Sequence, residues 1–198
     1  MKNHHKTTVN LVLSALFLAL GIVLPMLTGQ IAQIGSMLLP MHIPVLLCGF
    51  ICGYKYGAAV GFILPLIRTM LFGVPNLYPE AIAIAFELAA YGFLSGFLFG
   101  RAKWQCIKML YRCLIAAMLG GRIIRGIVQA LLLGFKGSPF VISGFMSGVI
   151  IHSIPGIILQ LILIPSIMLA LHKTHLVPFK NRKHHSKQQQ TEAQTNNI

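Results

Sequence analysis

The chain has 198 residues, of which 56% are hydrophobic and only 10% are charged; 16 Lys and Arg stand against 3 acidic residues, for a formal net charge of +13. Soluble domains carry about a quarter charged residues, and a soluble fold with so few charges would expose more apolar surface than water tolerates. The composition therefore excludes a soluble domain and predicts an integral membrane protein. Its basic residues lie at the ends of apolar segments and in the C-terminal tail, which argues against nucleic acid as a partner.

Six apolar segments predict an all-α membrane protein with six transmembrane helices, because spanning the bilayer takes roughly 20 apolar residues in a helix. A loop with a short re-entrant part is expected at Thr28–Met41, and Tyr54–Gly57 separates the second helix from the third. The polar, basic stretch 172–198 predicts a disordered cytoplasmic tail after a membrane domain of residues 1–171. The predicted helices are residues 8–27, 42–53, 57–72, 80–99, 113–135 and 141–171.

Glycines recur at four-residue spacing in two runs along the chain, and small residues let helix backbones approach closely in lipid. This spacing predicts packing inside the bundle. The glycines are Gly49, Gly53, Gly57 and Gly61 in one run, and Gly92, Gly96 and Gly100 in the other.

The distribution of Lys and Arg predicts the orientation. With the N-terminus in the cytoplasm, twelve of them fall on the cytoplasmic side and only Lys136 falls outside, while Arg68, Arg122 and Arg125 lie within helices. Cytoplasmic loops carry an excess of basic residues in membrane proteins. Both termini are therefore predicted to be cytoplasmic.

Polar residues within the helices are the functional candidates, because ionisable groups in a membrane are costly. Glu87 and Tyr91 share a helical stripe with Glu80, and Arg122, Arg125 and Gln129 form a second stripe at i, i+3 and i+7. The two stripes should face each other, since facing lipid would leave charges unpaired. The topology places them in the outer half of the bundle. This predicts an outward-opening pocket, with Thr28–Met41 and the turn Pro75–Pro79 as lids, lined by Arg68, Glu87, Arg122, Gln129 and His152.

Two interpretations of these charges remain open. Glu87 could pair with an arginine simply to hold helices together, or it could contact a ligand. Three arginines against two glutamates leave one positive charge, which favours an anionic solute, and the planar guanidinium suits a carboxylate. His42 could contact the ligand or bond to the backbone where its helix begins. Asn76 is a further candidate, although turns favour asparagine in any case.

The local sequence resembles the S components, the substrate-binding membrane subunits of energy-coupling factor (ECF) vitamin transporters, over roughly residues 8–171. The resemblance implies a six-helix subunit that works with a transmembrane coupling protein and two ATPase subunits, and that topples in the cell membrane to deliver its vitamin. In that family an AxxxA arrangement on the first helix faces the coupling protein, and Ala15 and Ala19 match it. The segments that carry the resemblance are Ala15–Ala19, Leu39–Phe50, Gly61–Arg68, Ala85–Leu88, Gly121–Gly126 and Ile154–Gln160.

The sequence thus predicts a non-catalytic binding subunit, and the surplus positive charge favours pantothenate among the vitamins this family takes. The chain contains no P-loop, GxSxG, HExxH or CxxC motif, and neither a cofactor nor a metal is expected. The alternative is a self-sufficient secondary transporter or channel with an Arg/Glu relay. The predicted substrate-binding residues are His42, Arg68, Asn76, Glu87, Tyr91, Arg122, Arg125, Gln129 and His152.

Overall fold

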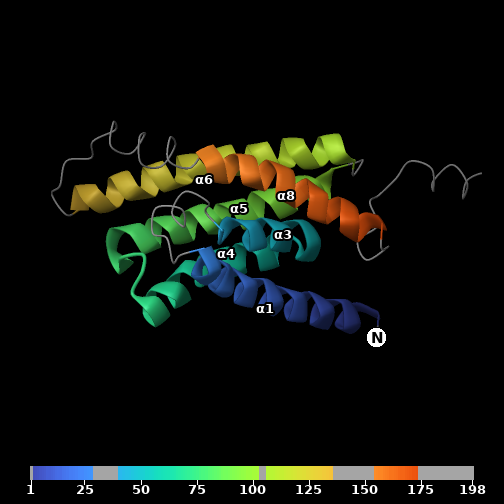
Figure 1. Cartoon of the computed structure of the whole chain (residues 1–198), viewed down its shortest axis with the longest axis horizontal. Helices are drawn as coiled ribbons and strands as arrows, with labels where there is room; N and C mark the ends of the chain where they lie inside the picture. Colours follow the sequence, from blue (N-terminus) through green and yellow to red (C-terminus); the bar gives the residue numbers. More distant parts are fainter. Residues whose placement is uncertain (1, 29–39, 103–105, 136–153, 174–198) are drawn as a thin grey trace, which may run out of the picture.

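The computed structural model describes residues 2–28, 40–102, 106–135 and 154–173, and in these ranges the chain forms helices and no strands (Figure 1). A short irregular turn, η1 (Leu77–Ala81), precedes the fourth helix in chain order. The six helices are α1 (Lys2–Thr28), α3 (His42–Cys52), α4 (Tyr54–Phe72), α5 (Ile82–Arg101), α6 (Ile107–Phe135) and α8 (Ile154–Lys173).

Five of these segments are long and apolar enough to cross a membrane, and α3 is a shorter apolar helix. The prediction of an all-α, multi-pass membrane protein is therefore confirmed. The stretches that meet this length and hydropathy are Lys6–Met26, Tyr54–Phe72, Leu77–Arg101, Ile107–Gly134 and Ile154–Lys173.

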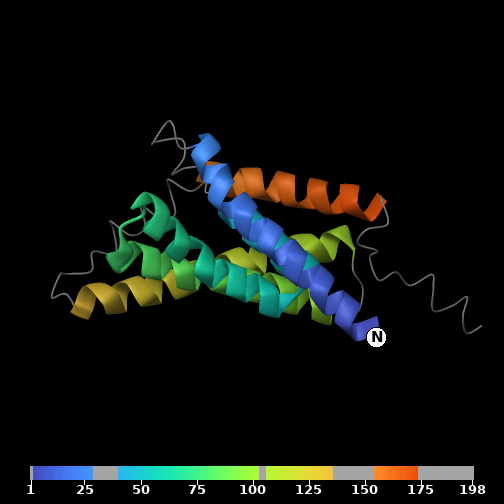
Figure 2. The ribbon, with the colours of Figure 1, turned by 90° about the horizontal axis from the view of Figure 1, so that it is seen from below.

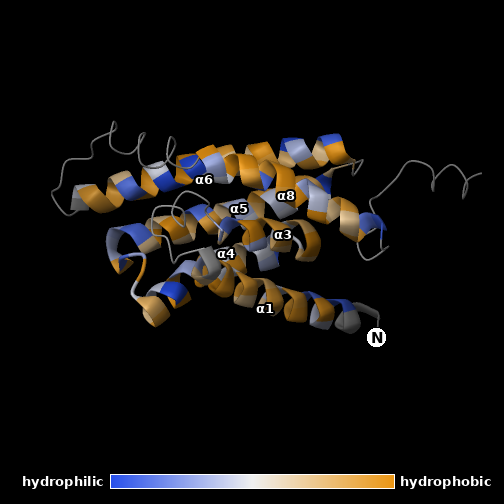
Figure 3. Ribbon diagram, viewed as in Figure 1, coloured by the Kyte–Doolittle hydropathy of each residue, from blue (hydrophilic) through white to orange (hydrophobic). Residues whose placement is uncertain are grey.

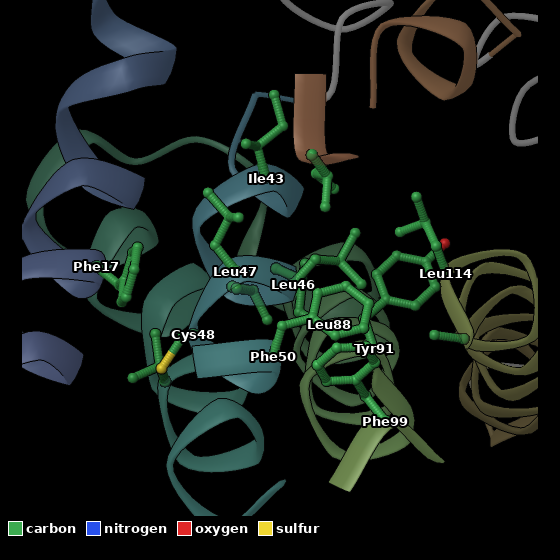
Figure 4. Close-up of a cluster of buried hydrophobic side chains, with 14 of the residues drawn as sticks. Phe17, Ile43, Leu46, Leu47, Cys48, Phe50, Leu88, Tyr91, Phe99 and Leu114 are labelled. Carbon is green, nitrogen blue, oxygen red and sulfur yellow. The ribbon is translucent and has the colours of Figure 1, made fainter. Parts of the chain in front are cut away.

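Helix α5 lies at the centre of the bundle and packs against α3, α4 and α6. Helix α1 crosses α3 and α4 on one side, while α8 lies against α3 and α6 on the other (Figures 1 and 2). Apolar side chains from α1, α3, α5 and α6 meet between these helices, as Figure 4 shows for Phe17, Leu46, Leu88 and Leu114. This arrangement brings polar residues of α3, α5 and α6 within reach of one another.

Glycines allow α3, α4 and α5 to touch backbone to backbone. A Cβ added at Gly92 would lie 2.1 Å from the carbonyl oxygen of Gly57, and one at Gly61 would lie 2.3 Å from that of Leu88. The predicted packing role of the glycine runs is therefore confirmed at these positions. Gly53 is different, because nothing lies near its added Cβ. Its φ of 95° ends α3 and separates it from α4.

Several helix boundaries differ from those predicted by hydropathy. Helix α6 begins at Ile107, six residues before the predicted start at 113, because its first turns expose Lys108 and Arg112 while burying Leu110. Helix α4 begins directly after Gly53, and α5 begins after η1. Residues 141–153 of the predicted sixth helix, most of the predicted loop Thr28–Met41 and the C-terminal tail lie outside the described residues.

Candidate functional site

A fully buried carboxylate, Glu87, is the centre of a polar cluster between α5 and α6. Arg125 donates a hydrogen bond from Nη1 to Glu87 Oε2 at 2.9 Å, and Arg122 Nε lies 3.4 Å from Oε1. The Tyr91 hydroxyl, one turn further along α5, donates to Oε1 at 2.8 Å. The two polar stripes therefore face each other as predicted, and Glu87 pairs with both arginines.

A glycine on α6 makes this geometry possible. A Cβ added at Gly121 would lie 2.2 Å from Cε1 of Tyr91 and 3.1 Å from the Glu87 carbonyl oxygen. The absent side chain lets α6 approach α5 at the level of Glu87. The next residue of α6, Arg122, can then reach the carboxylate, and its Nε lies 3.4 Å from Glu87 Oε1.

His42 brings the first turn of α3 to the same cluster. Its Nε2 lies 3.9 Å from Glu87 Oε2, and its ring centroid lies 5.3 Å from that of Tyr91. The side chain is buried, and neither ring nitrogen has a hydrogen-bond partner among the described residues. Among the described residues, the His42 side chain therefore does not bond to the backbone, which was the alternative to a ligand contact.

Arg125 and Gln129 present unpaired polar atoms on one face of α6. They are four residues apart, so their side chains lie on neighbouring turns. The buried Nε of Arg125 and Oε1 of Gln129 lack hydrogen-bond partners within the described ranges. A buried polar atom without a partner costs free energy, so these atoms are suited to bonding a ligand or water.

The cluster lies in the half of the bundle away from the basic ends of the helices. Glu87 is 14 residues from Arg101, which corresponds to about 21 Å along α5, and only five residues from the start of that helix at Ile82. Figure 3 shows hydrophilic residues at the termini of α1, α6 and α8 at the opposite end, beside the N-terminus. The cluster therefore lies toward the end of the bundle that the charge distribution predicts to face outward.

The structure does not bring every predicted residue to this cluster. Arg68 is partly buried on α4, and its Nε has no hydrogen-bond partner among the described residues, where the ion pairs of Glu87 are with His42, Arg122 and Arg125. Asn76 is exposed just before η1, where its carbonyl accepts a hydrogen bond from the Ala81 amide at 2.9 Å. The Tyr78 hydroxyl donates to the Leu132 carbonyl and so ties η1 to α6. His152 lies outside the described residues.

Gln160 on α8 is a candidate that was not among the predicted site residues. Its side chain is 1% exposed, and neither amide atom has a hydrogen-bond partner in the part of the chain that the structure describes. It belongs to the buried stripe of α8 with Gly156, Ile164 and Met168. In the sequence, Gln160 stands out only as a lone amide in a strongly apolar run. That its side chain faces the bundle is seen only from the packing of α8.

These features define a class of protein: a multi-pass membrane protein with a buried, positively charged polar cluster toward one end of its helix bundle. A sequence model of the family described as "ECF transporter, substrate-specific component" matches residues 9–168. The chain therefore belongs to this family of cell-membrane transport proteins. No curated protein and no solved structure matched the chain in two further comparisons.

Proposed function

We propose that this substrate-specific component captures a small organic anion, with pantothenate as the leading candidate, at the Glu87 cluster. Two arginines face one glutamate there, so the cluster has one formal positive charge in excess. Buried charge in a membrane is costly unless it is paired. An anionic substrate supplies the missing negative charge, and this surplus is the observation that carries the proposal.

The open polar atoms around the cluster suit such a ligand. The Nη1 of Arg125 bonds Glu87, whereas its Nε–H has no hydrogen-bond partner among the described residues. The Nε–H can therefore donate to the carboxylate of a ligand. Gln129 and His42 offer neutral donors and acceptors, which match hydroxyl and amide groups, and Gln160 adds a buried amide on α8. Pantothenate carries a carboxylate, an amide and two hydroxyl groups, so it can use both kinds of contact.

Calorimetric titration of the purified protein with pantothenate tests this proposal. We expect wild-type protein to bind, and Arg125→Gln to weaken binding about 10- to 100-fold, because a hydrogen bond to a charged group is lost. Arg125→Lys should give an intermediate affinity, since it keeps the charge but not the planar fork.

Arg112→Gln is the matched control, because Arg112 is exposed near the other end of the same helix. It removes the same charge and should bind as wild type does. Tight binding of a neutral or cationic vitamin in place of pantothenate would contradict the proposal. Equal losses in Arg112→Gln and Arg125→Gln would also contradict it, since they would show an effect of net charge alone.

We further infer that α1 presents the surface for the coupling protein, and that the ATPase subunits supply the energy for delivery by toppling. Ala15 and Ala19 are exposed on α1, while Ser14, Phe17 and Gly21 of the same helix face the bundle. The two alanines lie beside exposed apolar side chains, including Leu16 at 53% and Leu20 at 39%. Small residues among larger apolar ones allow a partner helix to pack closely.

Substituting both Ala15 and Ala19 with leucine should abolish co-purification of the coupling and ATPase proteins. Substrate binding should be retained, because these residues point away from the Glu87 cluster. Ala59→Leu is the control, since Ala59 is exposed on α4 and should leave co-purification unchanged. Loss of substrate binding together with loss of the partners would contradict the assignment of this surface.

A further inference from the structure

A row of aromatic rings lies on the outer face of the bundle where α4 begins and α5 ends. Phe93 and Phe97 of α5 stack with centroids 5.5 Å apart and an interplanar angle of 9°. Tyr54 of α4 meets both edge-on, at 5.6 and 6.1 Å. Tyr54 and Phe93 are 40% and 41% exposed, so the row faces the surrounding membrane rather than the core.

Two cations are held at this aromatic row. The guanidinium carbon of Arg101 lies 5.6 Å from the centroid of Phe97, and Lys55 Nζ lies 6.0 Å from that of Tyr54. These distances allow cation–π attraction, which restrains each charged group beside its ring. Phe93, Phe97 and Arg101 follow one another at four-residue intervals. The row therefore runs about 12 Å along α5, from the membrane interior toward its end.

No carboxylate of the described residues can neutralise these cations. The chain has three acidic residues, of which Glu87 is buried in the polar cluster and Glu80 lies in η1, beyond the other end of α5. The third, Glu192, lies outside the described residues. Further cations lie at the same end of the bundle, where α1 and α6 begin and α8 ends (Figures 1 and 3): Lys6, Lys108, Arg112 and Lys173.

We propose that this aromatic row binds an anionic glycerophospholipid. Its phosphate lies at Arg101, with Lys55 adding positive charge, and an acyl chain runs along Phe97 and Phe93. Basic side chains at a membrane surface attract anionic lipids, and aromatic rings are favoured at the depth of the headgroups. A water-soluble acidic partner would reach the cations but not the rings, which is why a lipid fits better. The proposal is independent of the transported substrate.

Native mass spectrometry of the full chain in detergent, titrated with phosphatidylglycerol or phosphatidylcholine, tests this proposal. We expect wild-type protein to retain one phosphatidylglycerol in clear preference to phosphatidylcholine. The double variant Lys55→Gln/Arg101→Gln should retain about tenfold less. Phe97→Leu keeps both cations but removes the central ring, and it should also lower retention.

Lys108→Gln/Arg112→Gln is the control, since it removes the same number of charges from exposed positions at the same end of the bundle. It should retain the lipid as wild type does. Glycerol phosphate at equal concentration should not displace the lipid, because it has no acyl chain; displacement would show an anion site without lipid specificity. That result, equal retention of the two lipids, or equal loss in the two double variants would overturn the proposal.

Discussion

Replacing Glu87 with glutamine is expected to lower the free energy of unfolding by about 3–5 kcal/mol, the cost of breaking a buried ion pair by removing one partner. Glutamine keeps the shape of the side chain and an oxygen that can accept from Tyr91. It removes the negative charge that pairs with both Arg122 and Arg125, so these two partly buried cations lose the carboxylate they share. Chemical denaturation in detergent micelles measures this loss.

Glu80→Gln provides the matched control for the Glu87 variant. Glu80 is exposed in η1, so the same substitution there should change stability by less than about 0.5 kcal/mol. Adding Arg125→Gln to Glu87→Gln should restore part of the lost stability, because one unpaired cation is then removed. If Glu87→Gln proved as stable as Glu80→Gln, the cluster would not be a paired, buried site.

Gly92→Ala should destabilise the bundle by at least about 3 kcal/mol, the upper part of the range for overpacking in a close-packed interior. The added Cβ would lie 2.1 Å from the carbonyl oxygen and 2.2 Å from the carbonyl carbon of Gly57. These are backbone atoms, so no side-chain rotation relieves the contact. Helix α4 would have to move away from α5. The expected result is a lower yield of folded protein and earlier unfolding in detergent.

Gly100→Ala on the same helix is the matched control for Gly92→Ala. Nothing lies within 4 Å of a Cβ at Gly100, so the methyl group meets open space. Alanine is also the better helix former, and stability should be unchanged or slightly higher. Equal stability of the two variants would contradict the backbone contact between α4 and α5.

Much of the fold and the centre of the site could be predicted from the sequence, because each followed from a local rule. Apolar length predicted the helices, and helical spacing placed Glu87 on one stripe and Arg122 with Arg125 on another. The cost of unpaired charge in lipid then required the stripes to meet. The close contact between Gly121 and the Tyr91 ring lets α6 approach α5 at the level of Glu87. No local sequence rule predicts this contact.

Other features depended on packing that no local rule describes. Hydropathy missed the first turns of α6, because Lys108 and Arg112 interrupt the apolar pattern although the helix continues through them. Depth alone suggested Arg68 as a neighbour of the cluster. In the described residues, however, the arginines that pair with Glu87 are Arg122 and Arg125 of α6, and Arg68 forms no ion pair with it. Gln160 was not selected as a site residue, because a single polar residue does not show which face of its helix is buried.

Native mass spectrometry of the full chain, purified gently in detergent from its own organism, tests the central claim most directly. The protein is expected to retain a small molecule whose mass identifies a carboxylate-bearing vitamin such as pantothenate. Arg125→Gln, expressed and purified in the same way, should lose that molecule, while Arg112→Gln should keep it. A retained vitamin without negative charge, or retention that does not depend on Arg125, would contradict capture of an anion at the Glu87 cluster.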